Sequence, residues 1–261
     1  MGVEFKQVCK SFGPKAVLKN VSFSVTDGEI LFILGKSGMG KSVTLKHIVG
    51  MLRPDSGQIL VDGEDVTRMD EIALTRVRRK CGMVFQHPAL LDSLTVLGNV
   101  SFGLRTLQYV TALLSCGKKA LSENQIEQTV LEKLALVNLG PEILDLFPPE
   151  ISYGMQKRVS LARTLAPEPQ YLLFDEPTTG LDPITTNAVN DLISNLSRKL
   201  NVTSVVVSHD MACALKIADR ILVLDQGEVL ALGTVPEILC SAQALVKEFL
   251  FETIQNGEPN G

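Results

Sequence analysis

The chain of 261 residues has the length of one α/β domain with a smaller insertion, and its formal net charge of -4 argues against a broad nucleic-acid-binding face. Its five cysteines are far apart and include no C-x-x-C pair, and only three histidines could join them in a metal site. No signal-peptide pattern opens the sequence, and no apolar run approaches the roughly 20 residues that span a bilayer. We therefore expect a cytosolic protein that reaches a membrane only through a partner.

Residues 3–34 alternate short apolar runs with turn signals. Residues 21–25 (VSFSV) show strict alternation of apolar and polar side chains, and Gly13-Pro14 and Asp27-Gly28 supply the turns. This pattern predicts a small N-terminal antiparallel β subdomain that leads into a buried strand at residues 30–34.

A phosphate-binding motif follows that strand directly. Residues 35–42, GKSGMGKS, fit the pattern G-x-x-x-x-G-K-[ST] without a substitution. We expect a helix over residues 43–52, ended by Pro54, so that the motif has a strand before it and a helix behind it. The alternative is a glycine-rich turn without a ligand, which this context disfavours.

The residues of this loop suit a bound nucleotide. Gly35, Gly38 and Gly40 let the backbone take turns that a Cβ would forbid, so that amide groups point at phosphate oxygens. The helix N-terminus adds partial positive charge. Lys41 is expected to reach the β- and γ-phosphates of ATP, and Ser42 to ligate Mg2+. The predicted nucleotide-binding residues of the loop are Gly35, Lys36, Ser37, Gly38, Met39, Gly40, Lys41, Ser42 and Val43.

The middle of the chain changes from strands to helices. Residues 58–61 and 82–85 are predicted strands, and residues 71–80 a helix with a basic C-terminal end. Helical patterns then prevail, and residues 122–125 (SENQ) open one helix with a capping box. We interpret residues 88–160, approximately, as a helical subdomain inserted into the α/β domain.

The α/β pattern resumes after this insertion. Helices are predicted at residues 154–165, 184–199 and 210–218, and strands at 171–174, 202–207, 221–224 and 228–232. Strands that alternate with helices predict a mostly parallel sheet covered on both faces. The expected fold is one α/β domain over residues 1–255, followed by a mobile tail at 256–261.

Two acids end the strand predicted at residues 171–174. Asp175, at the strand end, is placed to hold Mg2+ next to Ser42. Glu176 follows with its side chain directed differently, and is the candidate general base for an attacking water. An acidic turn at a sheet edge is the alternative, which the upstream phosphate motif disfavours.

Six motifs in order resemble those of the ATP-binding-cassette ATPases of ABC transporters. They are the phosphate motif, Gln86 after a strand, residues 151–155 (ISYGM) opening a helix, residues 174–177 (FDEP), residues 180–183 (GLDP) and residues 208–210 (SHD). The resemblance covers nearly the whole chain. It implies a P-loop NTPase fold and a head-to-tail homodimer of cassettes. Two ATP molecules would each lie between the phosphate loop of one copy and residues 151–155 of the other.

The resemblance implies roles for four further residues. Gln86 is expected to ligate Mg2+ and to position water. His209 is expected to contact the γ-phosphate and to orient Glu176. Asp182 is expected to communicate across the dimer, and Phe12 is the candidate for stacking on adenine. Each has an ordinary alternative when taken alone. Gln86 also fits an exposed polar residue at a strand end, His209 a structural histidine and Phe12 a core side chain. Around Asp182, Gly180 and Pro183 alone would only mark a turn.

Residues 151–155 depart from the family pattern Leu-Ser-Gly-Gly-Gln. Ser152 and Gly154 keep the groups implied to bind the γ-phosphate of the facing copy's ATP, at a helix start with free amides. Ser152 also suits an ordinary N-cap. Tyr153 places a side chain where the pattern has glycine, so either hydrolysis is slow or Tyr153 points away from the phosphate. Ile151 is a mild departure, and Met155 is shared with a subgroup.

Several stretches resemble one branch of the family, the ATPases of Mce-type lipid transporters of the Mla and Mkl kind. They are GKSGMGKSVTLK, FQHPALLDSLTVLGNVSFGL, SENQI, GMQKR and FDEPTTGLDPIT. This implies an MlaE-like permease, an Mce-type lipid-binding protein and a hydrophobic cargo such as phospholipid. The cassette would lie on the cytoplasmic face of the inner or plasma membrane.

Three alternatives to this branch stay open. One is an importer ATPase for another small solute, such as an amino acid. Another is a nucleotide-dependent regulatory cassette protein with weak hydrolysis. The third, a soluble cassette ATPase of DNA repair or translation, is disfavoured because coiled-coil arms, zinc hooks, a second cassette and a basic face are not visible in the sequence.

Two apolar stretches are candidate contacts for a permease. Residues 88–97 (PALLDSLTVL) follow Gln86 and carry many apolar side chains. The exposed part of them would form a groove for a short permease helix, unless all of them pack into a helical core. Residues 245–251 (LVKEFLF) are the second candidate, unless they pack on their own domain.

Overall fold

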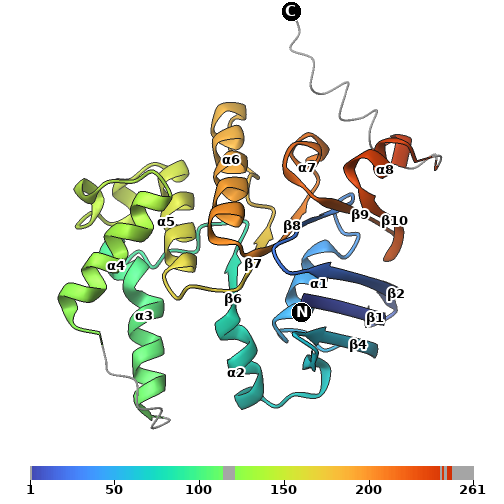
Figure 1. Cartoon of the computed structure of the whole chain (residues 1–261), viewed down its shortest axis with the longest axis horizontal. Helices are drawn as coiled ribbons and strands as arrows, with labels where there is room; N and C mark the ends of the chain where they lie inside the picture. The colour runs from blue at the N-terminus through green and yellow to red at the C-terminus, as the bar shows by residue number, and fades with distance from the viewer. Residues whose placement is uncertain (1, 114–120, 242, 244–245, 249–261) are drawn as a thin grey trace, which may run out of the picture.

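The computed structural model describes residues 2–113, 121–241, 243 and 246–248. The predicted tail at 256–261 and most of the candidate contact at 245–251 lie outside the described residues. No helix within the described ranges is long and apolar enough to cross a membrane. Figure 1 shows the sheet-containing part of the molecule and a separate group of helices at one end.

The larger of two sheets in the described residues has six strands, in the order β10-β9-β3-β8-β7-β6. Its strands are β3 (Ile30–Leu34), β6 (Cys81–Val84), β7 (Tyr171–Asp175), β8 (Thr203–Ser208), β9 (Arg220–Asp225) and β10 (Glu228–Thr234). All neighbours are parallel except β10 and β9. β3 and β8 are buried along their whole length, which is typical of a parallel sheet covered on both faces. The predicted sheet is confirmed.

The smaller sheet is antiparallel and has the order β2-β1-β4-β5. It contains β1 (Gly2–Phe12), β2 (Lys15–Thr26), β4 (Ser56–Val61) and β5 (Glu64–Asp65). Buried and exposed residues alternate over 21–25, as their sequence pattern predicts. The buried rings of Phe5 and Phe23 stack across the first hairpin with centroids 4.5 Å apart.

Side-chain caps start several helices at the places the sequence predicts. The helices of the described residues are α1 (Lys41–Ile48), α2 (Glu71–Lys80), α3 (Val96–Leu113), α4 (Glu123–Leu136), α5 (Tyr153–Leu165), α6 (Pro183–Leu200), α7 (Met211–Ile217) and α8 (Val235–Leu239), with 3-10 turns at Val66–Arg68, Pro141–Ile143 and Pro148–Glu150. Ser122 caps α4, and its predicted capping box with Gln125 is present. Helices α3, α4 and α5 pack together at the left of Figure 1, in the predicted helical subdomain. The boundaries of that subdomain stay a prediction.

The described residues form two hydrophobic cores, and both include side chains of the six-stranded sheet. Leu31 on β3 belongs to the core built with β1, β2, α1 and α2, whereas its neighbour Phe32 belongs to the core built with α3 to α7. Successive side chains of a strand point to opposite faces, so the two cores cover opposite faces of the sheet. The carboxyl ends of the parallel strands lie at one edge of this sheet.

Helix α1 ends earlier than the sequence predicts. It ends at Ile48, and Gly50 then takes a left-handed φ of 63°. A Cβ added to Gly50 would collide with Leu74 Cδ2 on α2. The chain therefore turns at Gly50, close against α2, and the prediction that Pro54 ends the helix was wrong.

Candidate functional site

The phosphate motif forms the loop between β3 and α1. Gly38 and Gly40 have left-handed φ values of 80° and 102°, which favour glycine. A Cβ on Gly40 would also lie 2.8 Å from Leu18 Cδ2. Gly35 is not left-handed, so the prediction of a special turn there was wrong; a Cβ at Gly35 would instead collide with the carbonyl oxygen of Leu224 on β9. Close packing of two strands therefore explains this glycine.

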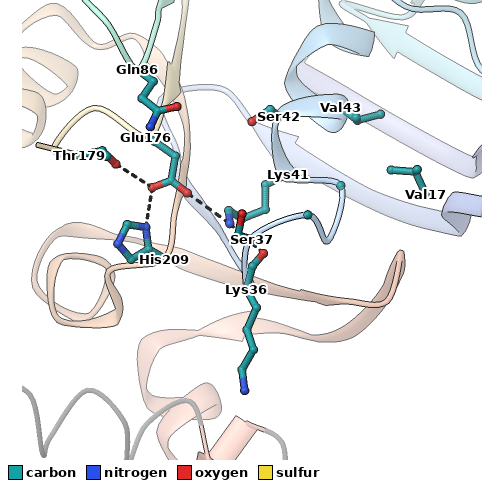
Figure 2. Close-up of a pocket in the computed structure, with 12 residues that line it drawn as sticks. Val17, Lys36, Ser37, Lys41, Ser42, Val43, Gln86, Glu176, Thr179 and His209 are labelled. Atoms are coloured by element: carbon teal, nitrogen blue, oxygen red, sulfur yellow. Dashed lines mark hydrogen bonds and ion pairs between the residues drawn. The ribbon is translucent and has the colours of Figure 1, made fainter. Parts of the chain in front are cut away.

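Lys41, the first residue of α1, is only 6% exposed. Its Nζ donates to the carbonyl oxygens of Gly35 (2.6 Å) and Lys36 (3.1 Å) and lies 3.2 Å from Glu176 Oε1. These three oxygens match the three N–H donors of an ammonium. Lys41 therefore connects the phosphate loop to the residue that follows β7, as Figure 2 shows.

Glu176 is mostly buried, and three side chains surround its carboxylate. Oε1 faces Lys41, while Oε2 accepts from Thr179 Oγ1 (3.4 Å) and lies 2.8 Å from His209 Nδ1 (Figure 2). The backbone φ of Glu176 is 49°, and its N–H donates to the carbonyl of Val207 over 3.0 Å. A left-handed residue with a side chain is uncommon and occurs where its surroundings fix it, often at functional sites.

Ser42 and Asp175 bring a hydroxyl and a carboxylate together. Ser42 Oγ donates to Asp175 Oδ1 over 2.6 Å, and Gln86 lines the same pocket as Ser42. Asp175 ends β7 and Gln86 follows the neighbouring β6, so parallel topology places both at one edge of the sheet. Oxygen donors of this kind suit Mg2+. No group of three or more His, Cys, Asp or Glu that could hold a metal by itself occurs in the described ranges.

Lys41, Ser42, Gln86, Glu176 and His209 line a pocket of about 750 Å3, whereas Asp175 is not among its lining residues. It is lined by Val17, Lys36, Ser37, Gly38, Gly40, Lys41, Ser42, Val43, Gln86, Glu176, Thr179 and His209 (Figure 2). Val17 and Thr179 were not predicted. Thr179 follows Glu176 by three residues, and this proximity is the one feature of the sequence that could have identified it as a pocket residue. Val17 is an ordinary strand valine, and no sequence feature marks it as a pocket residue.

Met39 and Phe12 are not among these lining residues. Met39 Sδ accepts a hydrogen bond from the N–H of Gln226 (3.2 Å), in the turn between β9 and β10. Phe12, at the end of β1, is 47% exposed, which contradicts the alternative of simple core packing. Lys10 Nζ lies 5.5 Å from its ring centroid. The ring is accessible enough to stack on a base.

Ser152, Gly154 and Asp182 all lie in the described ranges but are not among the residues that line this pocket. Ser152 caps α5, because its Oγ accepts from the N–H of Met155 (3.3 Å). Asp182 caps α6, and hydrogen bonds from the side chain and backbone of Thr185 hold the pKa of Asp182 below its usual value. Within one chain, these three predicted residues therefore do not line the pocket around Lys41.

Tyr153 contacts Lys157, and the sequence did not predict this contact. Tyr153 Oη lies 3.3 Å from His87 Nδ1, so the side chain reaches toward the loop after β6. Lys157 is 6% exposed and donates to three backbone carbonyls in the loops after β6 and β7. Burial lowers the pKa of Lys157 to about 8, so its ammonium is mostly protonated at neutral pH.

Known proteins are similar to this chain in sequence. The ABC transporter family model matches residues 18–179. The methionine import ATP-binding protein MetN of Carboxydothermus hydrogenoformans is 39% identical over 92% of this chain and 68% of its own length. The intermembrane phospholipid transport system ATP-binding protein MlaF of Haemophilus influenzae is 38% identical over 99% of this chain and 92% of its own length.

A solved structure shares the fold as well. It is the dimeric structure of a post-hydrolysis state of the ATP-binding cassette MJ0796 bound to ADP and Pi, with a TM-score of 0.78 and 33% identity. The similarity covers 89% of this chain and 98% of that one. The expected fold class and family are therefore confirmed. The chain belongs to the ABC transporter family and is an ATPase subunit of that family.

Proposed function

We propose that two copies of this chain assemble head to tail and form two composite ATP sites. The pocket around Lys41 would hold each nucleotide, and Ser152 and Gly154 of the facing copy would close over its γ-phosphate. The free amides at the start of α5 suit a phosphate group. Ser152 accepts one hydrogen bond as a cap and keeps its own O–H to donate. The MJ0796 cassette, which is dimeric when bound to ADP and Pi, supports the assembly of two copies.

Nucleotide binding is assigned to the phosphate loop and Phe12. A phosphate would give Lys41 a charged acceptor, which binds an ammonium more strongly than a neutral carbonyl does. The amides of the loop would face the same phosphates. Phe12 would stack on the adenine with its exposed ring. Asp182, at the cap of α6, would carry communication between the two copies.

Hydrolysis is assigned to Glu176 as general base. Water attacks the γ-phosphorus, Glu176 accepts a proton from that water, and the bond to the leaving ADP oxygen breaks. His209 holds Oε2 of Glu176 and would also contact the γ-phosphate. Gln86, in the same pocket, would position the water.

Ser42, Asp175 and Gln86 are the residues that would hold Mg2+ beside the phosphates. Ser42 Oγ and Asp175 Oδ1 already meet over 2.6 Å, and hydroxyl, carboxylate and amide oxygens are ligands that Mg2+ accepts. When bound, Mg2+ neutralises charge on the β- and γ-phosphate oxygens. The donor set therefore fits the expected metal.

Closing and opening of the dimer would drive a membrane permease. ATP contacts both copies and favours the closed dimer, and hydrolysis weakens that bridge and reopens it. In the segment 88–97, Val96 is fully buried and Leu90 and Leu97 pack against the core, but Leu91 is 41% exposed. Phe85 and Phe102 are exposed as well. These exposed apolar side chains are the proposed contact for a permease helix, on the cytoplasmic face of the inner or plasma membrane.

The proposed cargo is phospholipid or another hydrophobic lipid, moved together with an MlaE-like permease and an Mce-type lipid-binding protein. The similarity to MlaF over 99% of this chain carries this proposal. The stretches GMQKR and SENQI, which resemble the same branch, add to it. MetN is equally similar, so a small-solute importer is the second candidate.

Copurification with membrane partners tests the cargo. The tagged chain is purified from its own cells in detergent, and the attached proteins and lipids are identified. An MlaE-like permease, an Mce-type protein and phospholipid are the expected result, and an amino-acid permease with a solute-binding protein would refute the lipid proposal. Leu91→Asp should lose the permease, whereas the matched control Leu239→Asp, an equally apolar exposed position on α8, should keep it.

A further inference from the structure

Helix α5 presents two side chains to the loops that carry Gln86 and Glu176. Tyr153 and Lys157 are four residues apart, so they lie one above the other on the same face of the helix. Lys157 Nζ lies 5.6 Å from the centroid of the Tyr153 ring, within the range of a cation–π interaction. The two side chains therefore form one continuous contact.

Lys157 connects two loops through its buried ammonium. Its Nζ donates to the carbonyl oxygens of Gln86 (2.9 Å), Pro177 (2.8 Å) and Thr179 (3.1 Å). The first carbonyl belongs to the residue proposed to position water, and the other two follow Glu176 directly along the chain. These bonds use all three donors of the ammonium, so Lys157 fixes one loop relative to the other.

Tyr153 adds a second contact to the Gln86 loop and stands next to Ser152. Its Oη lies 3.3 Å from His87 Nδ1. In the proposed dimer Ser152 contacts the ATP of the facing copy, whereas Gln86 acts on the ATP of its own copy. The first two turns of α5 therefore join the group that touches one ATP to the loops that act on the other.

We propose that Lys157, supported by Tyr153, is a positioning residue for ATP hydrolysis, which holds the Gln86 and Glu176 loops in place against the start of α5. This inference rests on the proposed function, because it takes the roles of Gln86 and Glu176 from there. Neither Lys157 nor Tyr153 is among the residues that line the nucleotide pocket. Their loss should therefore lower the rate of hydrolysis without weakening nucleotide binding.

The test compares Lys157→Met with Arg158→Met in the assembled transporter. Arg158 is the next residue of α5, but it donates to the carbonyl of Asn138, away from both loops. The kcat of Lys157→Met should fall about 10-fold to 100-fold below that of Arg158→Met, because a misplacement of about 1 Å costs roughly that much. The Kd for a fluorescent ATP analogue should change by less than about threefold, since only the step after binding is affected. A merely structural role would weaken nucleotide binding together with kcat.

Tyr153 supplies a second comparison in which folding is not at risk, because its side chain is 38% exposed. Tyr153→Ala should lower kcat several-fold at unchanged Kd. Tyr153→Phe keeps the ring over the ammonium and should recover most of that loss. If Lys157→Met does not fold, this pair decides the question.

The outcomes separate this inference from the proposed function. Glu176→Gln is measured in the same preparation. If Glu176→Gln abolishes hydrolysis while Lys157→Met and Tyr153→Ala match Arg158→Met, the proposed function stands and the positioning role is overturned. Absence of hydrolysis in the wild-type complex would overturn both.

Discussion

Ser42 Oγ lies 2.6 Å from Asp175 Oδ1, which joins the first turn of α1 to the carboxyl end of β7. The two residues are far apart in the sequence and meet because β3, which leads into α1, and β7 are both neighbours of β8 in the parallel sheet. A hydroxyl and a carboxylate at one point form a partial ligand set for Mg2+.

Removal of the Ser42 hydroxyl should make hydrolysis more dependent on the metal. In Ser42→Ala the Mg2+ concentration for half-maximal ATPase activity is expected to rise roughly tenfold, because one oxygen ligand is lost. A magnesium titration of the assembled transporter measures this. Ser56→Ala, at an exposed position of β4, is the control, and equal magnesium dependence in the two variants would contradict the assignment.

Lys41→Ala should weaken nucleotide binding. A charge-assisted hydrogen bond contributes about 1.5 to 3 kcal/mol, so the affinity for ATP is expected to fall about 10-fold to 100-fold. The variant also leaves the Glu176 carboxylate without its cation. Titration with a fluorescent nucleotide measures the effect against Lys46→Ala, which changes a lysine of the same helix outside the pocket. The assignment fails if both variants bind ATP alike.

Two glycines allow backbone strain and steric collision to be separated. Gly40 and Gly63 both have left-handed φ values, but a Cβ on Gly40 would meet Leu18, whereas one on Gly63 would meet no described atom within 4 Å. Gly63→Ala should lower the free energy of unfolding by about 1 kcal/mol, through backbone strain alone. Gly40→Ala should lower it by at least about 2 kcal/mol, because the collision adds to that strain. Urea unfolding of both variants tests this, and equal losses would contradict the packing at Gly40.

The lowered pKa of Asp62 makes the free energy of unfolding depend on pH in the acid range. Burial alone would raise the pKa of Asp62, but hydrogen bonds from Lys80 and Tyr171 outweigh it and lower the pKa. A carboxylate with a lowered pKa stabilises the fold above its unfolded pKa of about 3.9, and this contribution is lost as the pH falls through the lowered value. The free energy of unfolding should therefore fall more steeply below about pH 4 in the wild type than in Asp62→Asn. Asp92→Asn, at an exposed position, should follow the wild type; identical curves for all three proteins would refute the prediction.

Contiguous motifs were predictable from the sequence, whereas contacts across the fold were not. The loop at 35–42 and the cap at Ser122 depend on neighbours within a few residues, so local sequence patterns predict them. Position 35 requires glycine because a Cβ there would collide with a backbone carbonyl on β9. The turn after α1 requires glycine at position 50 because Leu74 of α2 lies against it. Such contact partners are distant in sequence, so a local sequence pattern cannot predict them.

The same limit applies to the site. Acids after a strand and a phosphate loop identify Asp175 and Glu176 as candidates, because parallel strands end at one edge of the sheet. In the sequence Lys157 looks like an ordinary helix residue. Its three acceptors are backbone carbonyls, which every residue type has, so no pattern of side chains indicates them. The roles of Ser152 and Asp182 stay predictions that depend on a second copy of the chain.

Glu176→Gln in the assembled transporter tests the central claim most directly. The variant keeps the shape of the side chain and loses the base, so hydrolysis should fall at least about 100-fold, the usual cost of one positioned transition-state group. ATP-dependent dimerisation should remain, and Glu168→Gln, at an exposed site, should hydrolyse ATP like the wild type. Near-normal ATPase activity in Glu176→Gln would contradict the account.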